Sequence, residues 1–301
     1  MQDAILTIGH GTVDDLDDLP AFLATIRRGH AASPELVAEV RRRYEAIGGR
    51  SPLNDICRDV TRLLGERLGL RAAYAGRMWA PKAVDVLTEL GAIGVTRVVV
   101  VPLAQHSAPL YVETVRAAAL AAKDAGDAPI EVVGGGNWGQ EPLLTSALAA
   151  ALTEAIGRVP ETLRGTTRIV MSAHSLPLAV VRAGDPYERE VRESASAVAK
   201  AVGARMLPHQ VIFQSQGMSG GEWLGPDVRT VLDGLATEGV AHVLFAPIGF
   251  LADHVEVLYD LDIEARRWAE ERGMSYSRTT SLNASEALVL AVAAVARRAL
   301  A

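Results

Sequence analysis

The chain has 301 residues, enough for two domains that each bury an ordinary hydrophobic core. Its 30 Lys and Arg residues against 36 Asp and Glu residues give a net charge of -6, so it lacks the excess positive charge with which proteins bind a phosphate backbone, and we expect no nucleic-acid partner. The longest apolar run, residues 287–296, is shorter than the roughly 18 residues that span a bilayer, and no signal-peptide pattern opens the chain. We therefore expect a cytoplasmic protein without stable membrane association.

Short runs of β-branched residues alternate with longer segments of helical periodicity. The predicted strands are residues 4–8, 97–101, 130–133, 168–171, 210–213 and 241–246. The predicted helices, with charges on one side and Leu, Val or Ala on the other, are residues 34–46, 81–91, 111–125, 141–157, 226–239 and 255–272. Continuous apolar strands such as residues 98–101 are typical of a parallel sheet covered by helices on both faces, so the fold class is α/β.

Cys57 is the single cysteine of the sequence. It permits no internal disulfide, and an iron–sulfur cluster or a zinc site normally needs about four thiolate or imidazole ligands at close spacing. We expect no iron–sulfur cluster, and we expect the Cys57 side chain to be small and buried.

The sequence contains an internal repeat. Residues 98–103, VVVVPL, resemble residues 243–248, VLFAPI, and the same distance along the chain separates Pro81 from Pro226. His10 and His174, each expected at a strand end, are farther apart than that distance. The first half therefore contains an insertion, which we place at residues 27–51. Because ligands of parallel sheets bind at the carboxyl ends of the strands, we expect His10 and His174 to face one cleft between two duplicated halves.

The candidate metal site combines His174 with a row of carboxylates. Glu256, Asp260 and Glu264 recur at i, i+4 and i+8, which places them along one face of a helix. A lone histidine is usually structural, and a charged row is usually a solvated helix face. This row, however, contains no Lys or Arg before Arg266, and an imidazole together with carboxylates suits a borderline metal such as ferrous iron.

Two other motifs suggest other enzymes. Residues 134–139, GGGNWG, match the dinucleotide-binding pattern, but no acidic residue ends the next predicted strand, so we favour a turn over a dehydrogenase site. Ser172 and Ser175 flank His174, but neither lies in the G-x-S-x-G elbow of a serine hydrolase.

Arginines gather in the insertion, at Arg27, Arg28 and residues 41–43, beside the turn GGRSP at residues 48–52. Surface arginines are usually only solvated. At the mouth of a cleft, however, guanidinium groups bind carboxylates or phosphates through paired hydrogen bonds, and we predict an anion-binding cluster.

Several long motifs, in order, resemble the ferrochelatases, in particular the short, soluble coproporphyrin ferrochelatases of bacteria. They are IRRG at 26–29, RYEAIGG at 43–49 with SPL at 51–53, SAHSLP at 172–177, GDPY at 184–187, QSQG at 214–217 with WLGPD at 223–227, and DHVEVLYD at 253–260. The resemblance implies two Rossmann-like, chelatase-type halves with parallel sheets flanked by helices and a porphyrin cleft between them.

The resemblance also implies the domain ranges and the roles of site residues. The first half covers residues 1–153, with the C-terminal helix in 279–301 packing back on it, and the second half covers residues 154–278. His174 and Glu256 form the catalytic metal site, and Asp260 and Glu264 form an outer metal path on a helix that is partly π in relatives. The residues implied to bind the porphyrin are His10, Arg27, Arg28, Arg43, Tyr44 and Ser51.

One departure concerns His10. Relatives of the coproporphyrin type commonly have a tyrosine at this position that coordinates the iron of the product. Imidazole is the stronger iron ligand of the two, so axial ligation through His10 remains an open alternative.

The resemblance predicts a lyase of haem biosynthesis that inserts ferrous iron into coproporphyrin III to give coproheme. Iron is a substrate in this reaction, and we expect no other cofactor. We expect a monomer that makes transient contacts with other enzymes of the haem pathway. The alternatives are a protoporphyrin IX ferrochelatase, a cobalt or nickel chelatase of a related tetrapyrrole, and a non-catalytic porphyrin carrier.

Overall fold

The structure is a computed structural model that describes residues 2–217 and 221–301. The chain forms two compact units. One runs up to Trp138 and includes Asn283–Ala301, and the other is Gly139–Leu282. The expected boundary at 153/154 falls inside α6 (Pro142–Arg158), which packs on α9 (Tyr187–Val202) in the second unit, so the division comes before α6. The second division, expected at 278/279, lies at 282/283.

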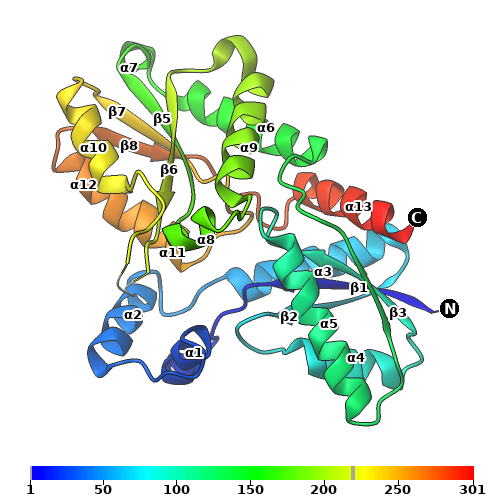
Figure 1. The fold of residues 1–301 in the computed structure, drawn as a ribbon. Coiled ribbons are helices and arrows are strands. Elements are labelled where there is room, and N and C mark those ends of the chain that lie inside the picture. Colours follow the sequence, from blue (N-terminus) through cyan, green and yellow to red (C-terminus); the bar gives the residue numbers. More distant parts are fainter. Residues whose placement is uncertain (1, 218–220) are drawn as a thin grey trace. The chain divides into compact units, whose positions relative to one another are not determined.

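The first unit is built on a four-stranded parallel sheet of order β2-β1-β3-β4 (Figure 1). Its strands are β1 (Asp3–Gly9), β2 (Arg71–Gly76), β3 (Arg97–Pro102) and β4 (Glu131–Gly134). Alternate β1 residues, among them Leu6, pack with α4 (Ala83–Ala92) and α5 (Ala108–Asp124) on one face of the sheet. On the other face, Thr7 of β1 is hydrogen-bonded to Thr61 of α3 (Leu53–Leu68).

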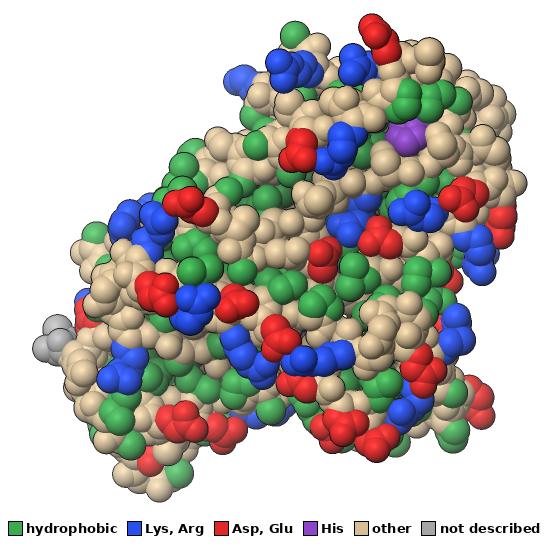
Figure 2. Space-filling model, turned by 180° about the vertical axis from the view of Figure 1, so that it is seen from behind, with side chains coloured by type: hydrophobic (Ala, Val, Ile, Leu, Met, Phe, Trp, Pro, Cys, Tyr) green, Lys and Arg blue, Asp and Glu red, His purple; other side chains and the backbone are tan. Residues whose placement is uncertain are grey.

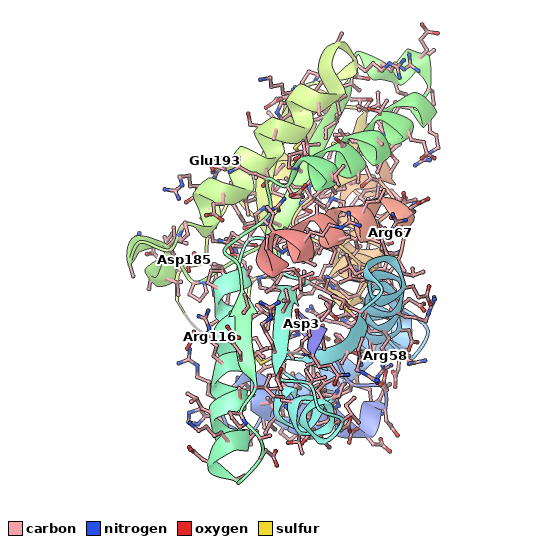
Figure 3. All side chains as sticks on the ribbon, turned by 90° about the vertical axis from the view of Figure 1, so that its right-hand side faces the viewer. Asp3, Arg58, Arg67, Arg116, Asp185 and Glu193 are labelled. Carbon is pink, nitrogen blue, oxygen red and sulfur yellow. The ribbon has the colours of Figure 1, made fainter. Side chains whose placement is uncertain are left out.

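The C-terminal helix, α13 (Glu286–Leu300), belongs to the first unit and packs on α3 and β3. Arg67 of α3 donates a 3.0 Å hydrogen bond to Glu286, the first residue of α13, and Figure 3 shows Arg67 beside this helix. The predicted insertion follows α1 (Leu19–Ile26) directly and contains α2 (Pro34–Ala46), whose N-cap is Ser33.

The second unit repeats the architecture of the first. Its parallel sheet has the order β6-β5-β7-β8, formed by β5 (Thr167–His174), β6 (His209–Gln214), β7 (His242–Ala246) and β8 (Ser275–Arg278). One face is covered by α6 and α9, and the other by α10 (Val228–Thr237), a π-helix (Asp260–Ala265) and α12 (Arg266–Glu270). Figure 1 shows α6 and α9 on one side of the strands and α10 and α12 on the other. The duplicated α/β fold is therefore confirmed.

The shorter helical elements connect the larger ones. They are η1 (Leu16–Asp18), α7 (Glu161–Arg164), α8 (Leu178–Arg182), η2 (Gly203–Arg205) and α11 (Val255–Leu258).

Charged side chains of both signs are interspersed over the face drawn in Figure 2. Among residues 2–217 and 221–301, no helix is both long and apolar enough to cross a membrane. Cys57 is buried, as predicted.

Candidate functional site

His174 is the last residue of β5 and lies beside Glu256. The His174 ring nitrogen Nδ1 donates a hydrogen bond to the carbonyl oxygen of Ser175, because a carbonyl oxygen can only accept. The other ring nitrogen, Nε2, is 3.2 Å from Oε1 of Glu256, and both side chains are 35% exposed. Nε2 is thus the nitrogen that faces the carboxylate.

The electrostatics of this pair favour a charged imidazole. Burial of the ring opposes its positive charge, but the Glu256 carboxylate, its hydrogen bond, the Ser175 carbonyl and the charge of Asp260 outweigh burial and raise the pKa of His174 to about 9. At neutral pH the pair therefore holds one proton on the side of Nε2, which that nitrogen must release before it can bind a metal.

The backbone of Glu256 is held from two sides. Its N–H donates to Nδ1 of His254, the N-cap residue of α11, at 3.1 Å. Its carbonyl oxygen accepts a 2.8 Å hydrogen bond from Nε2 of Gln214, at the end of β6. Since β6 is the sheet neighbour of β5, one sheet edge positions both His174 and Glu256.

The carboxylate row continues along the π-helix. Asp260 accepts a 2.5 Å hydrogen bond from the hydroxyl of Ser215, which follows β6. The N–H of Glu264 donates to the carbonyl oxygen of Tyr259 at 3.0 Å, which is the bond of a π turn. Within the described residues, no three His, Cys, Asp or Glu side chains gather as ligands of one metal ion.

His10 occupies the equivalent place in the first unit, directly after β1. Its Nδ1 forms a 2.9 Å hydrogen bond with the carbonyl oxygen of Gly11, as that of His174 does with Ser175. The ring also meets Phe22 of α1 edge-on, with 6.4 Å between the ring centroids. Both histidines therefore carry the proton on Nδ1 and direct the lone pair of the neutral ring to Nε2.

The other residues predicted to bind the porphyrin lie in the first unit. The Tyr44 hydroxyl is 2.6 Å from that of Thr12, two residues after His10, and both side chains are buried. Nε of Arg43 donates to Glu39 at 2.9 Å. The Ser51 hydroxyl is buried and accepts from the N–H of Leu53 at 3.4 Å.

Arg27 is the C-cap residue of α1, Arg28 follows it, and both side chains are exposed. Arg28 has a φ of 56° in the turn that closes the helix, and this turn presents both side chains to solvent.

The glycine-rich loop at 134–139 has a structural role. The Asn137 side chain accepts a 2.7 Å hydrogen bond from the N–H of Ala108 at the start of α5, and the N–H of Trp138 donates to the carbonyl oxygen of Gln105. The loop thus supports α5, which agrees with the prediction of a turn.

Sequence reasoning did not single out three residues that hold this site. Gln214 and Ser215 support Glu256 and Asp260, and the buried Tyr187 donates to the carbonyl oxygen of His174 at 2.9 Å. All three belong to motifs that carried the family resemblance. Their position near the end of β6 or the start of α9 was the available signal.

A model of the ferrochelatase family matches residues 2–300. The chain belongs to the ferrochelatase family. It is 36% identical to a ferrochelatase of Acidobacterium capsulatum, over 99% of this chain and 94% of that protein. It is also 33% identical to the coproporphyrin III ferrochelatase of Bacillus subtilis, over 97% of this chain and 96% of that protein.

Among solved structures, the ferrochelatase chain is similar to SirB from Bacillus subtilis with Fe3+, with a TM-score of 0.61 and 13% identity over 100% of this chain and 96% of the other. At this identity the likeness concerns the fold, which is that of the chelatases.

Proposed function

We propose that this ferrochelatase inserts ferrous iron into coproporphyrin III and gives coproheme. The observation that carries the chelatase activity is the His174–Glu256 pair, 3.2 Å apart at the carboxyl edge of the second sheet, in a chain matched by the family model from end to end. The similarity to a coproporphyrin III ferrochelatase supports the choice of porphyrin.

Insertion exchanges one Fe2+ for the two protons of the pyrrole nitrogens, so the site has to bind a cation and accept protons. With Nε2 deprotonated, His174 offers an imidazole lone pair, and Glu256 offers a carboxylate 3.2 Å away. The pair first releases to solvent the proton that it holds at neutral pH. As the cation enters the ring, whichever of the two side chains does not bind it accepts the two pyrrole protons in turn and passes them to solvent. Asp260 and Glu264 then form the outer path of the cation along the π-helix, and iron remains a substrate with no resident cofactor.

The arginines of the first unit supply the contacts to the propionates. Coproporphyrin has four propionates and protoporphyrin has two, so the former offers more carboxylates to Arg27, Arg28 and Arg43. Each charge-assisted hydrogen bond contributes roughly 1.5–3 kcal/mol when shielded from water and less when exposed. Nε of Arg43 donates to Glu39, so a propionate bound at Arg43 would compete with that carboxylate.

Tyr44 and Ser51 are buried in the same unit, and their proposed role is to line the porphyrin site. His10, with its proton on Nδ1, can donate the Nε2 lone pair to the iron of the product as an axial ligand.

The test is an anaerobic steady-state assay with Fe2+ and either coproporphyrin III or protoporphyrin IX, in buffer without detergent. We expect a higher kcat/KM for coproporphyrin, and we expect Arg43→Ala to narrow the gap between the two porphyrins. Equal or better use of protoporphyrin would refute the choice of porphyrin and leave the chelatase activity standing. Insertion of only Co2+ or Ni2+, or tight binding without insertion, would refute the ferrochelatase activity itself.

His174→Ala and Glu256→Gln test the metal site. Both variants are expected to lose most turnover and to keep porphyrin binding, because the anchoring arginines lie in the other unit. His209→Ala, which alters an exposed histidine of β6, is the matched control and should retain turnover. Normal turnover of Glu256→Gln would show that the row of carboxylates is only a solvated helix face and has no role in metal insertion.

A further inference from the structure

Arg278, the last residue of β8, contacts two aspartates of the segment that carries the proposed metal ligands. We name residues 253–264 the carboxylate segment. The Arg278 guanidinium donates from Nε to Oδ1 and from Nη2 to Oδ2 of Asp262, both at 2.8 Å, which is the paired geometry of a strong arginine–carboxylate interaction. Nη2 also reaches Oδ1 of Asp253 at 3.4 Å. Asp253 precedes Glu256, and Asp262 lies in the π-helix between Asp260 and Glu264.

The remaining N–H groups of Arg278 bind the chain that follows β8. Nη1 donates to the carbonyl oxygen of Thr279 at 2.9 Å and to the hydroxyl of Ser281 at 3.2 Å. The Ser281 hydroxyl donates in turn to Asp253 at 2.6 Å. All five N–H groups of the guanidinium thus have acceptors, and the side chain is 12% exposed.

We infer that Arg278 is a positioning residue for metal insertion. By binding both Asp253 and Asp262 it fixes the carboxylate segment, and in this way it determines the positions of the Glu256 and Asp260 side chains. The inference rests on the proposed function. A π turn is a rare departure from the α-helix, and this one begins at the outer carboxylate Asp260. The Ser215 hydroxyl holds this turn at Asp260 from β6, and Arg278 holds it at Asp262 from β8.

A lysine cannot replace this arrangement. Its ammonium keeps the positive charge but has three N–H groups and no planar fork, so it can hold one of the two aspartates and not both in the observed geometry. Arg278→Lys therefore preserves the charge of the site and removes the simultaneous hydrogen bonding of one side chain to Asp253 and Asp262. Asp262→Asn weakens the same link by removing the carboxylate that Arg278 binds through two hydrogen bonds.

The expected result is a loss of metal affinity without a loss of porphyrin affinity. Changing residues that orient metal ligands typically lowers metal affinity about 10–100-fold. We expect Arg278→Lys to raise the KM for Fe2+ about tenfold or more and to leave the KM for coproporphyrin within twofold. In porphyrin-free protein, titration with Co2+ as a spectroscopic probe should show a similar loss of affinity. Asp262→Asn should reproduce the effect, and the double variant should be no worse than either single variant.

Arg272→Lys is the matched control. Arg272 is another shielded arginine of the second unit, with Nε on Asp233 at 2.6 Å and Nη1 on the carbonyl oxygen of Trp268. It should match Arg278→Lys in thermal stability and keep wild-type affinity for Co2+. Hydrogen exchange of the backbone amides at 257–265 should accelerate in Arg278→Lys and remain unchanged in Arg272→Lys.

The outcomes separate this inference from the proposed function. A wild-type protein that inserts iron, together with an Arg278→Lys variant of unchanged Co2+ affinity, would overturn the inference alone. A change in Co2+ affinity without faster exchange at 257–265 would also overturn it, because the effect would not pass through the segment. A wild-type protein that inserts no iron would refute the proposed function and the metal-insertion role of Arg278, and the exchange measurement would then decide only whether Arg278 fixes the segment.

Discussion

Replacing Gly249 with alanine should displace His174. Gly249 follows β7, and its N–H donates to the carbonyl oxygen of Ser172 at 3.0 Å. A Cβ at this position would lie 2.5 Å from Cβ and 2.7 Å from Cα of Ala173, whereas ordinary contacts begin at 3.4 Å. Ala173 is fully buried in β5, so relief of the clash has to move the end of that strand by nearly 1 Å, and His174 is its last residue.

Two quantities follow from this displacement. Overpacking of a dense core costs about 1–3 kcal/mol of unfolding free energy. A misplacement of about 1 Å at a catalytic group can cost on the order of a hundredfold in rate. We therefore expect Gly249→Ala to unfold at lower urea concentration and to lose ten- to a hundredfold in kcat, since the 3.2 Å approach of His174 to Glu256 is disturbed.

Gly234→Ala is the control for this variant. Gly234 lies inside α10, and a Cβ there meets no atom within 4 Å, so alanine should be neutral or stabilise by up to about 1 kcal/mol through its helix propensity. If Gly249→Ala unfolded at the same urea concentration as Gly234→Ala and kept full turnover, the close packing of Gly249 on β5 would be irrelevant to both properties. Loss of stability with full turnover would show that β5 yields without moving His174.

Three further predictions follow from buried or exposed side chains. Burial raises the pKa of the Cys57 thiol to about 12, so about one thiol in ten thousand is ionised at pH 8. A disulfide reagent should therefore react with Cys57 only after urea unfolds the chain, and rapid reaction in native buffer would contradict this. Burial lowers the pKa of His106 to about 4, so between pH 6.5 and 4 the unfolded state binds more protons than the folded state. The free energy of unfolding therefore falls as the pH decreases from 6.5, by up to about 3 kcal/mol. His106→Gln should lose less stability than wild type between pH 7 and 5 in urea titrations, and equal losses would exclude His106 as the cause. His10→Phe should alter the absorption and resonance Raman spectra of bound coproheme, and identical spectra would remove His10 as an iron ligand.

The central strands could be predicted from the sequence, and two edge strands could not. β1, β3, β5 and β7 lie inside their sheets and are rich in Val, Ile and Leu, and all four were predicted. β2 has the sequence RAAYAG and β8 has the sequence SYSR. Each pairs with a neighbour on one side only, so tertiary context forms these strands in spite of a weak local preference.

The site was predicted where a single stretch of sequence carries the signal. A histidine after an apolar strand and a row of spaced carboxylates are local patterns, and they led to His174 and Glu256. The hydrogen bonds of Gln214 and Arg278 to the carboxylate segment join stretches of chain that are distant in sequence. No local pattern predicts such a contact, because the sequence around a glutamine or arginine at a strand end does not show whether its side chain faces water or a helix.

The repeat explains why the carboxylates belong to the second unit. Counted from Pro102 and Pro247, Val115 corresponds to Asp260 and Ala119 corresponds to Glu264. Val115 and Ala119 of α5 pack on the first sheet, but in the second unit the core positions are taken by the next residues, Leu261 and Ala265. The shift by one residue coincides with the π turn, which contains one residue more than an α turn.

An uninterrupted α-helix at this place would press Asp260 and Glu264 into the apolar core, where unpaired charges are costly. The π turn lets the helix keep an apolar face on the sheet while both carboxylates remain partly exposed. The second half therefore carries a row of charged groups at the edge of the sheet and keeps the apolar packing that holds the helix there. A residue that stabilises the π turn from outside, as Arg278 does through Asp262, therefore stabilises the exposed placement of these carboxylates as well.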